Sequence, residues 1–531
     1  MADGPMTMPP TPRRTVPPVH PLLLATYPIL FLYGQNLGEV RIGELLAPIA
    51  LSLAAATTVY GLFSAVLRDV RRGALLASIV VLAVFGFGRV RDLLDGTALG
   101  GGRLLLAWGM LTVLAMVLAV RVRRGPIRLT SGLNLVAAIL AITAAAPIAV
   151  HELGAIGAGG AGAGGPTPRP VVAGSSSGPA RDIYYIMVED LGSERTLRED
   201  YGLQETGLFD WLREDGFVVP TDARTNYNKT VQVLAAAFNM TYLDEVAARV
   251  GAQSGDAHPL YEMIDDNVVA RFLKAQGYRY HHIGAWWDPT ERSSIADRNY
   301  GLQQRSDFAA TLYRTTILPD VVARLPRLGI RLPIEADATG DEGQYASALY
   351  GFQALEEASA APGPKFVFAH FLIPHDPFVF AADGSRLTPE LRRGRSANEL
   401  FLEQARYTNT RVRAIVEALL AGPEATRPII VVQTDEGPHP ARYERDPTDF
   451  AWTDATLGEL RVKFEILNAF YLPGVEVPAI PPTMSPVNTF RLIFSLYFGA
   501  DLPLLPDRQV IFRDKAHPYD FTDVTDRLTS P

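Results

Sequence analysis

Cysteine is missing from this chain of 531 residues. Its absence excludes a disulfide framework, a thiol nucleophile and a cysteine-ligated metal site. Such frameworks and sites otherwise hold together many small extracellular domains, so a folded domain here has to rely on a buried core.

Charge is scarce in the first third of the chain and has the opposite sign to the rest. Residues 1–180 carry 14 Arg against 7 Asp and Glu, whereas residues 181–531 carry 35 Lys and Arg against 50 Asp and Glu. Nucleic-acid binding depends on clustered cations along the phosphates. We therefore expect no nucleic-acid partner.

Five apolar stretches fill the region that is poor in charge. They span residues 21–40, 45–67, 73–88, 104–120 and 129–150. A helix needs about 20 mainly apolar residues to cross a bilayer. One such stretch alone is compatible with a buried helix of a soluble protein, but five in succession predict an integral membrane domain of about five helices over residues 21–152. The first stretch is the weakest, because Gly34, Gln35 and Asn36 interrupt it.

Arginine placement predicts the orientation of these helices. The loops expected on the cytoplasmic side carry Arg13, Arg14, Arg68, Arg71, Arg72, Arg121, Arg123, Arg124 and Arg128. The other loops carry Arg41, Arg89, Arg91 and Arg103. With a Pro-rich cytoplasmic tail at residues 1–20, five spans place residue 152 onward outside. The prediction is a multi-pass protein of the cell membrane with an extracytoplasmic C-terminal domain.

Residues 153–180 are rich in Gly, Ala, Pro and Ser, which predicts a flexible linker. Residues 181–531 then alternate between short apolar runs and longer amphipathic stretches. We expect strands at 183–188, 278–285, 366–371 and 429–433, and helices at 261–276, 342–360 and 397–420. This alternation predicts an α/β domain with a mostly parallel central sheet flanked by helices.

Acidic residues follow two of the predicted strands. Glu189 and Asp190 follow the first, and Asp435 and Glu436 follow the one at 429–433. Ligands collect at the carboxyl ends of parallel strands, where carboxylates can converge on a metal ion. The alternative is that these residues cap helices or face water.

Thr230 precedes an apolar stretch at 231–240 and is expected near a helix N-terminus. Free backbone N–H groups and the helix dipole favour an anion or a developing alkoxide there, and a bound metal would activate the hydroxyl further. On spacing alone, an ordinary N-cap threonine is the simpler reading.

Several segments together resemble the sulfatase-like branch of the alkaline phosphatase superfamily, in particular membrane-anchored members such as lipoteichoic acid synthase and related phosphoglycerol transferases. The resemblance covers residues 182–512. It is carried by residues 182–189, 226–230, 370–378, 433–437, 464–474 and 485–491.

The resemblance implies a metal site and a nucleophile. Glu189 and Asp435 match acidic metal ligands, and Thr230 matches a nucleophile that also binds the metal. His375 is similar to a histidine that holds the substrate phosphate. Further substrate contacts implied by the resemblance are Trp287 and Arg292.

One position departs from the family pattern. Glu436 stands where the family usually has a ligating histidine, so the implied ligand set of Glu189, Thr230, Asp435 and Glu436 is all oxygen. Such a set suits Mg or Mn better than Zn, and we expect a divalent ion, Mn or Mg. The acidic cluster leaves two alternatives open: a rearranged set that includes Asp190, and an imidazole supplied by His439.

The leading hypothesis is a metal-dependent transferase or hydrolase that acts on a lipid- or envelope-linked phosphoester through Thr230. A membrane lipid or lipid-linked phosphoester is the expected donor. Glu436 also favours a second hypothesis, a catalytically inactive scaffold of the same fold for envelope assembly. A sulfate-ester hydrolase is the third; the lack of Cys speaks against it, because an enzyme that matures a cysteine into its catalytic aldehyde is excluded. The oligomeric state stays open.

Overall fold

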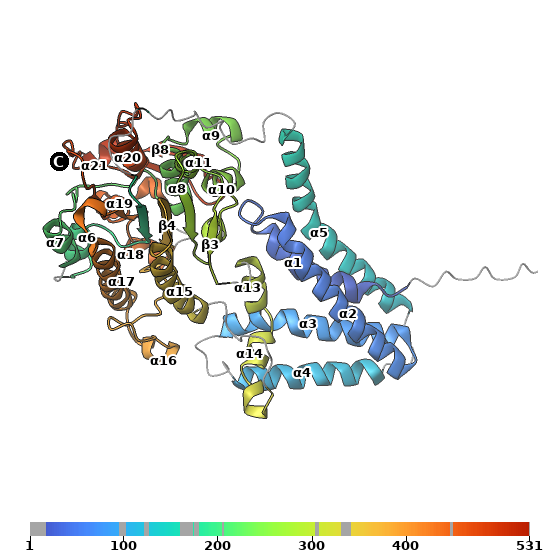
Figure 1. The fold of residues 1–531 in the computed structure, drawn as a ribbon. Coiled ribbons are helices and arrows are strands. Elements are labelled where there is room, and N and C mark those ends of the chain that lie inside the picture. The colour runs from blue at the N-terminus through green and yellow to red at the C-terminus, as the bar shows by residue number, and fades with distance from the viewer. Residues whose placement is uncertain are drawn as a thin grey trace, which may run out of the picture. The chain divides into compact units, whose positions relative to one another are not determined.

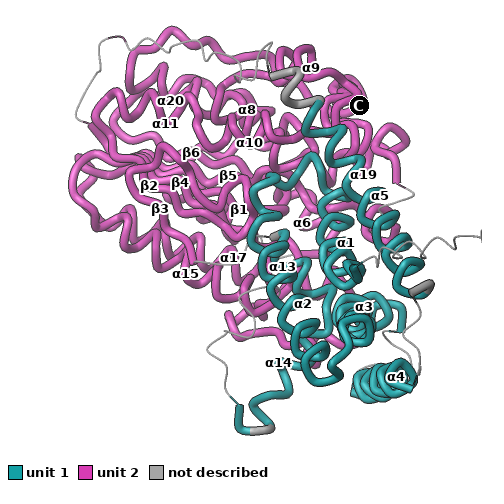
Figure 2. The backbone as a smooth tube through the Cα atoms, turned by 90° about the vertical axis from the view of Figure 1, so that its right-hand side faces the viewer, with its two compact units in different colours: residues 1–160, 308–336 teal, residues 161–307, 337–531 magenta. Residues whose placement is uncertain are grey.

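The computed structural model describes residues 17–94, 102–121, 127–159, 174, 180–203, 207–302, 307–330, 341–446 and 450–529 (Figure 1). The chain divides into two compact units (Figure 2). The helical unit comprises Met1–Gly160 and Phe308–Ala336, and the α/β unit comprises Ala161–Asp307 and Asp337–Pro531. Each unit is described by itself below.

The helical unit contains α1 (His20–Gly34), the 3-10 helix η1 (Ile42–Leu45), α2 (Leu46–Leu67), α3 (Val70–Leu94), α4 (Gly102–Arg121) and α5 (Ile127–Gly159). Among the described residues, four helical segments are long and apolar enough to cross a membrane, namely Ile42–Leu67, Val70–Leu94, Gly102–Arg121 and Leu129–Leu153. The fifth predicted helix, α1, has only 15 residues, or about 22 Å of helix against a hydrocarbon core of about 30 Å. The predicted membrane bundle is confirmed, with four helices of spanning length and one shorter.

Large apolar side chains point outward along this bundle. Leu51 is 72% exposed, and Leu106 is 71% exposed. Exposing such a surface to water is unfavourable for a soluble protein, whereas contact with lipid acyl chains is favourable. The residues that form the long apolar stretches of the sequence therefore also form the outward surface of the bundle.

A segment from the middle of the chain also belongs to the helical unit. It contains α13 (Asp307–Arg314), α14 (Leu318–Val322) and the 3-10 helix η2 (Leu325–Leu328). The sequence boundaries placed all of residues 181–531 in the outer domain, and the structure differs here. Phe308 and the partly buried Leu312 pack on the bundle core, an association between distant segments that local sequence patterns do not reveal.

The α/β unit is built on a six-stranded sheet of order β3-β2-β4-β1-β5-β6. The strands are β1 (Ile183–Val188), β2 (Arg279–Ile283), β3 (Arg298–Tyr300), β4 (Lys365–Phe371), β5 (Ile429–Thr434) and β6 (Asn468–Tyr471). All neighbours are parallel except the pair β5 and β6. The predicted mostly parallel α/β fold is confirmed.

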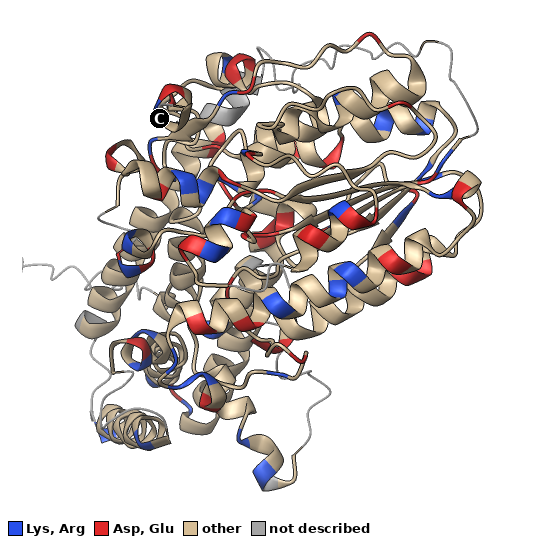
Figure 3. Cartoon of the chain, turned by 90° about the vertical axis from the view of Figure 1, so that its left-hand side faces the viewer, with Lys and Arg blue, Asp and Glu red and all other residues tan. Residues whose placement is uncertain are grey.

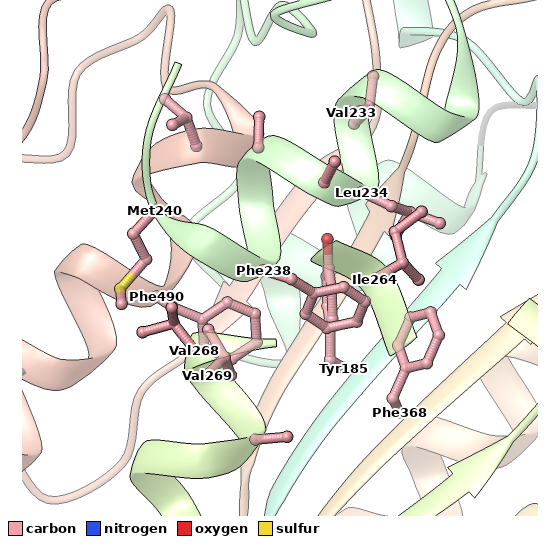
Figure 4. Packing of buried hydrophobic residues seen from close by; sticks show 14 of the residues in the cluster. Tyr185, Val233, Leu234, Phe238, Met240, Ile264, Val268, Val269, Phe368 and Phe490 are labelled. Carbon is pink, nitrogen blue, oxygen red and sulfur yellow. The ribbon is translucent and has the colours of Figure 1, made fainter. Parts of the chain in front are cut away.

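Both faces of the sheet are buried, because side chains along a strand alternate between them. Tyr185 and Met187 of β1 join one apolar cluster, and Tyr184 and Ile186 join the other. Figure 4 shows the first cluster, where Tyr185 lies among Phe238, Phe368 and other apolar side chains. The main helices of that face are α8 (Thr230–Asn239), α10 (His258–Asp265), α11 (Val268–Ala275) and α20 (Thr489–Phe498). Those of the opposite face are α7 (Gly207–Glu214), α15 (Asp341–Ser359) and α17 (Ala397–Leu420).

Shorter elements complete this unit, and both signs of charge are interspersed on its helices (Figure 3). The helices are α6 (Glu194–Glu199), α9 (Asp244–Val250), α12 (Asp288–Glu291), α16 (Pro389–Arg392), α18 (Ala441–Arg445), α19 (Leu457–Phe464) and α21 (Thr525–Thr529). The 3-10 helices are η3 (Glu424–Thr426), η4 (Trp452–Asp454) and η5 (Pro486–Asn488). A separate antiparallel pair is formed by β7 (Val510–Phe512) and β8 (Phe521–Asp523).

Two predicted boundaries differ from those of the helices in the structure. The helix expected over 261–276 is two helices, because the Asn267 side chain accepts a hydrogen bond from the N–H of Ala270 and starts α11 anew. The linker expected over 153–180 overlaps the end of α5, which continues to Gly159. Residues 1–16 of the predicted tail and most of the remaining linker lie outside the described residues.

Candidate active site

Three adjacent parallel strands bring the acidic residues to one edge of the sheet. Val188, the last residue of β1, pairs in register with Phe371 of β4 and Thr434 of β5. The residues that follow these strands therefore emerge side by side. Glu189, Asp190, Asp435 and Glu436 are all buried there, which excludes the reading that they face water.

Thr230 is the first residue of α8, directly after the N-cap Lys229. Its hydroxyl lies 3.4 Å from Glu189 Oε1, to which it donates a hydrogen bond. Thr230 therefore lies at a helix N-terminus, as expected, and next to Glu189, one of the predicted ligands. The catalytic role of Thr230 stays a prediction.

A buried lysine lies among the carboxylates. Lys463 of α19 is fully buried, and its ammonium lies 2.8 Å from Glu436 Oε1 and 3.3 Å from Asp190 Oδ1. Asp190 follows β1 with a φ of 54°, a left-handed conformation that Asp adopts more readily than most residues. Sequence reasoning missed Lys463; the only local signal is a lysine between Val462 and Phe464 on an otherwise apolar part of a helix.

The acidic cluster shifts the pKa values of its members in opposite directions. Burial and the charges of Glu189 and Glu436 hold the pKa of Asp435 well above its usual value. Burial also raises the pKa of Glu436, to about 7, although Lys463 opposes this. Burial would raise the pKa of Asp190 as well, but Lys463 and His375 outweigh it and lower that pKa. Asp435 and Glu436 thus hold their protons more tightly than Asp190 does, because Lys463 alone does not offset the charge of the whole cluster.

Three histidines border the acidic cluster. His370 of β4 has its Nε2 3.2 Å from Glu189 Oε1. His375 Nε2 and His439 Nδ1 each lie 3.8 Å from Asp190 Oδ2. Burial would lower the pKa of His375, but the carboxylates of Asp190 and Glu189 outweigh burial and raise that pKa to about 9. His375 is therefore a cation at neutral pH, in a place where an anionic group can meet it.

These groups open into a pocket of about 800 Å³. It is lined by Glu189, Asn228, Lys229, Thr230, Trp286, Trp287, Leu372, His375, Glu436, His439, Tyr443, Phe450, Trp452, Phe512, Arg513, Asp514, Lys515 and Ala516. The predicted Trp287 is among them, with its ring 6.1 Å from that of His370. The predicted Arg292 is exposed and does not line the pocket. Sequence reasoning missed the cations Arg513 and Lys515, which come from a loop far along the chain.

The donor set fits an oxygen-preferring divalent ion in part. Asp435 Oδ2 and Glu436 Oε2 are buried and have no hydrogen-bond partner among the described residues, as expected of oxygens that accept from a cation. Yet in the same part of the chain no three His, Cys, Asp or Glu side chains are grouped to hold a metal. Glu436 Oε1 is paired with Lys463 at 2.8 Å, whereas its Oε2 remains an oxygen donor in addition to Glu189, the Thr230 hydroxyl and Asp435. The role of Glu189, Thr230, Asp435 and Glu436 as metal ligands stays a prediction.

The fold and this site define a class: a membrane-integral protein with an α/β domain whose pocket combines a helix-terminal hydroxyl, a carboxylate cluster and a cationic histidine. A model of the sulfatase family matches residues 181–474, more than half of the chain. The chain therefore belongs to the sulfatase family, and the resemblance inferred from its sequence is confirmed.

The solved structures that match this chain include a periplasmic domain, a phosphoethanolamine transferase and a putative sulfatase. The C-terminal periplasmic domain of EcEptC from Escherichia coli is 14% identical, with 67% of this chain and 96% of that chain covered and a TM-score of 0.41. The lipooligosaccharide phosphoethanolamine transferase EptA from Neisseria meningitidis is 11% identical, with 86% and 88% covered and a TM-score of 0.34. A putative sulfatase from Bacteroides thetaiotaomicron is 11% identical, with 63% and 78% covered and a TM-score of 0.39. No curated protein matches the chain.

Proposed function

We propose that this protein is a metal-dependent transferase or hydrolase that acts on a lipid- or envelope-linked phosphoester, with Thr230 as nucleophile. The carrying observation is the hydrogen bond from the Thr230 hydroxyl to Glu189, made at a helix N-terminus inside the pocket. A hydroxyl there has a proton acceptor beside it and backbone N–H groups that favour developing negative charge.

The residues of the pocket can carry the proton transfers of a two-step reaction. In the first step Thr230 Oγ bonds to phosphorus, its proton passes to Glu189, and the ester oxygen leaves with a proton from His375. In the second step an acceptor hydroxyl or water bonds to phosphorus, its proton passes to His375, and Thr230 regains its proton from Glu189 as the Thr–phosphorus bond breaks. A divalent ion held by Glu189, Thr230, Asp435 and Glu436, Mn or Mg from the oxygen donors, would supply positive charge beside the phosphoryl oxygens.

The surroundings of the site support a large donor with a phosphoester. Trp286 and Trp287 offer apolar faces to its non-phosphate part, while Arg513 and Lys515 attract its charge. Because the same chain carries helices long and apolar enough to span a membrane, the proposed donor is a membrane lipid or a lipid-linked phosphoester. The arginine distribution of the loops favours an extracytoplasmic position of the α/β unit.

A labelled donor tests the proposal. Full-length protein with added Mn or Mg is mixed with a phospholipid labelled in its headgroup phosphate, and the protein is searched for label by mass spectrometry. We expect label on Thr230, turnover that stops with a chelator, no label on Thr230→Ala, and partial activity of Thr230→Ser. Turnover by Thr230→Ala at the wild-type rate would refute the nucleophile. Turnover of an aryl sulfate but of no phosphoester would instead establish a sulfate-ester hydrolase.

The ion pair between Lys463 and Glu436 favours a second candidate, an inactive scaffold for envelope assembly. An internal ammonium offsets part of the acidic charge without a metal. The metal content of the purified protein separates the two. About one divalent ion per chain supports the enzyme, whereas a metal-free protein whose melting temperature is unaffected by Mn or Mg supports the scaffold.

A further inference from the structure

The segment of residues 308–330 packs on the membrane helices as part of the helical unit, in which Figure 2 colours it. Phe308 lies in one apolar cluster with Ile29 and Tyr33 of α1 and Ile148 of α5. The rings of Phe308 and Tyr33 meet edge to face, 6.2 Å apart. Tyr33 also donates a hydrogen bond to Glu152 of α5 at 3.0 Å. The start of the segment is therefore fixed to the C-terminal halves of α1 and α5.

The rest of the segment is fixed to the C-terminal half of α3. The N–H of Ile317 donates to the carbonyl of Val84 at 2.9 Å. Gly88 allows close approach, because a Cβ there would lie 2.1 Å from the carbonyl oxygen of Thr315. Arg91 bonds to Asp320 at 3.1 Å. Since α1, α3 and α5 are alternate helices of the bundle, their C-terminal ends lie at one membrane surface, the one from which α5 leads into the α/β unit.

The face that this segment leaves uncovered is apolar and basic. Its apolar set is Leu318, Val321 and Ile330, which are 43%, 37% and 47% exposed. Its basic set is the exposed pair Arg314 and Arg327, because Arg324 is paired at 3.2 Å with the one acidic residue, Asp320. The surplus of two positive charges contrasts with the surplus of 15 negative charges over residues 181–531 as a whole. Apolar side chains flanked by arginines are typical of segments that lie in a membrane interface.

We propose that residues 308–330 form an interfacial anchor, which lies in the headgroup region of the bilayer at the surface where α1, α3 and α5 end. The apolar set enters the acyl boundary, and the basic set contacts anionic lipid phosphates. Continuity with the membrane-spanning bundle and the local positive charge both point to lipid as the occupant of this face. The anchor interrupts the α/β unit between β3 and α15, so it attaches that unit to the membrane at two further points of the chain. This proposal does not depend on the catalytic activity.

Spin labels can measure the depth of the segment, because the chain has no cysteine and every introduced one is unique. Full-length Leu318→Cys is labelled in phosphatidylcholine vesicles that contain phosphatidylglycerol. Its accessibility to oxygen, which concentrates in lipid, is compared with that to a water-soluble nickel complex. The lipid reference is Leu114→Cys, an exposed position in α4, and the water reference is Glu214→Cys, an exposed position at the end of α7.

We expect the label at 318 to favour oxygen over nickel, at a depth between those of the two references. A label at 318 that behaves like the one at 214 would place the segment in water and overturn the proposal. Low accessibility to both reagents would place it against protein, such as a second copy of the chain, and would also overturn it. Val321→Cys repeats the measurement should Leu318→Cys not fold.

The basic set is tested by lipid composition. We expect nickel accessibility at 318 to fall when phosphatidylglycerol is added to phosphatidylcholine vesicles. In the double variant Arg314→Gln and Arg327→Gln this fall should be lost. An equal fall in the double variant would refute the phosphate contacts.

Discussion

The helical unit and the α/β unit place apolar and charged groups in opposite ways. The helical unit exposes large apolar side chains such as Leu51 and Leu106, whereas the α/β unit buries Asp190, Asp435 and Lys463 at a sheet edge. Each arrangement is costly in water alone. The first is relieved by lipid outside the protein, and the second by cations beside the carboxylates. The apolar surface of the helical unit therefore depends on lipid, and the buried carboxylates of the α/β unit depend on nearby cations such as Lys463. The predictions below test these dependences.

The largest effect is expected at the buried lysine. Lys463→Met leaves Asp190 and Glu436 without their shared ammonium, and breaking a buried pair in this way costs about 3–5 kcal/mol of stability. Lys365→Met is the matched control, because Lys365 is also buried but its partner Asp182 is 28% exposed and is rehydrated readily. Thermal or denaturant unfolding of the purified variants measures the difference. Equal losses in both would mean that the acidic cluster does not need Lys463.

The second-largest effect is expected for Asp435→Asn, which should lower activity without lowering stability. The variant removes a predicted metal ligand, and we expect turnover to fall about 10²–10³-fold, the usual cost of one preorganised group. Its metal-free stability should not fall, because Asn relieves the repulsion that holds the pKa of Asp435 high. Turnover and melting temperature are measured on the same preparation. A drop in both would identify Asp435 as a structural residue instead.

A smaller effect tests the packing of the helical unit. Gly88→Ala drives a methyl group into the backbone carbonyl of Thr315, and overpacking of this kind costs about 1–3 kcal/mol. Gly86→Ala, two residues away on α3, meets only Trp108 at 3.5 Å, so the better helix propensity of Ala should leave it equal to or above wild type. Melting temperatures in detergent compare the two. The prediction fails if both variants behave alike.

The smallest effect is a pH dependence from His375, whose pKa of about 9 lies above its ordinary value of 6.5. A raised pKa means that the folded protein holds this proton more tightly, so the stabilisation is complete below about pH 6.5 and is lost as the pH rises through 9. Affinity for an anionic phosphoester should fall over the same upper range. The apparent KM is measured from pH 7 to 10 for wild type and His375→Gln, and the upper-range rise should be missing from the variant.

Local sequence patterns were sufficient for much of the fold. The bounds predicted for the strands β1, β4 and β5 and the helices α15 and α17 agree with the structure to within a residue or two, because short apolar runs alternate with longer amphipathic stretches along this part of the chain. The start of α8 at Thr230 followed from the same change of pattern. The break between α10 and α11 was missed, since a side-chain cap within an apolar stretch barely alters its periodicity.

The candidate site was only half predictable. Glu189, Asp435 and Glu436 could be found because each directly follows a strand, and parallel strands end at one edge. Lys463, Arg513 and Lys515 could not, because each comes from an element with no sequence relation to those strands. The place of His370 at the site was also missed, because it is the penultimate residue of a strand whose sequence is typical of a buried core.

The sequence by itself determined that the chain has a membrane bundle, a mostly parallel α/β domain and a cluster of acids at its strand ends, because these follow from hydrophobic period and residue order. Only the tertiary structure decided that Lys463 neutralises Glu436 and that residues 308–330 join the membrane helices. Both depend on contacts between segments far apart in the chain. Such contacts are selected by the total burial and charge pairing of the folded molecule, which no local pattern contains.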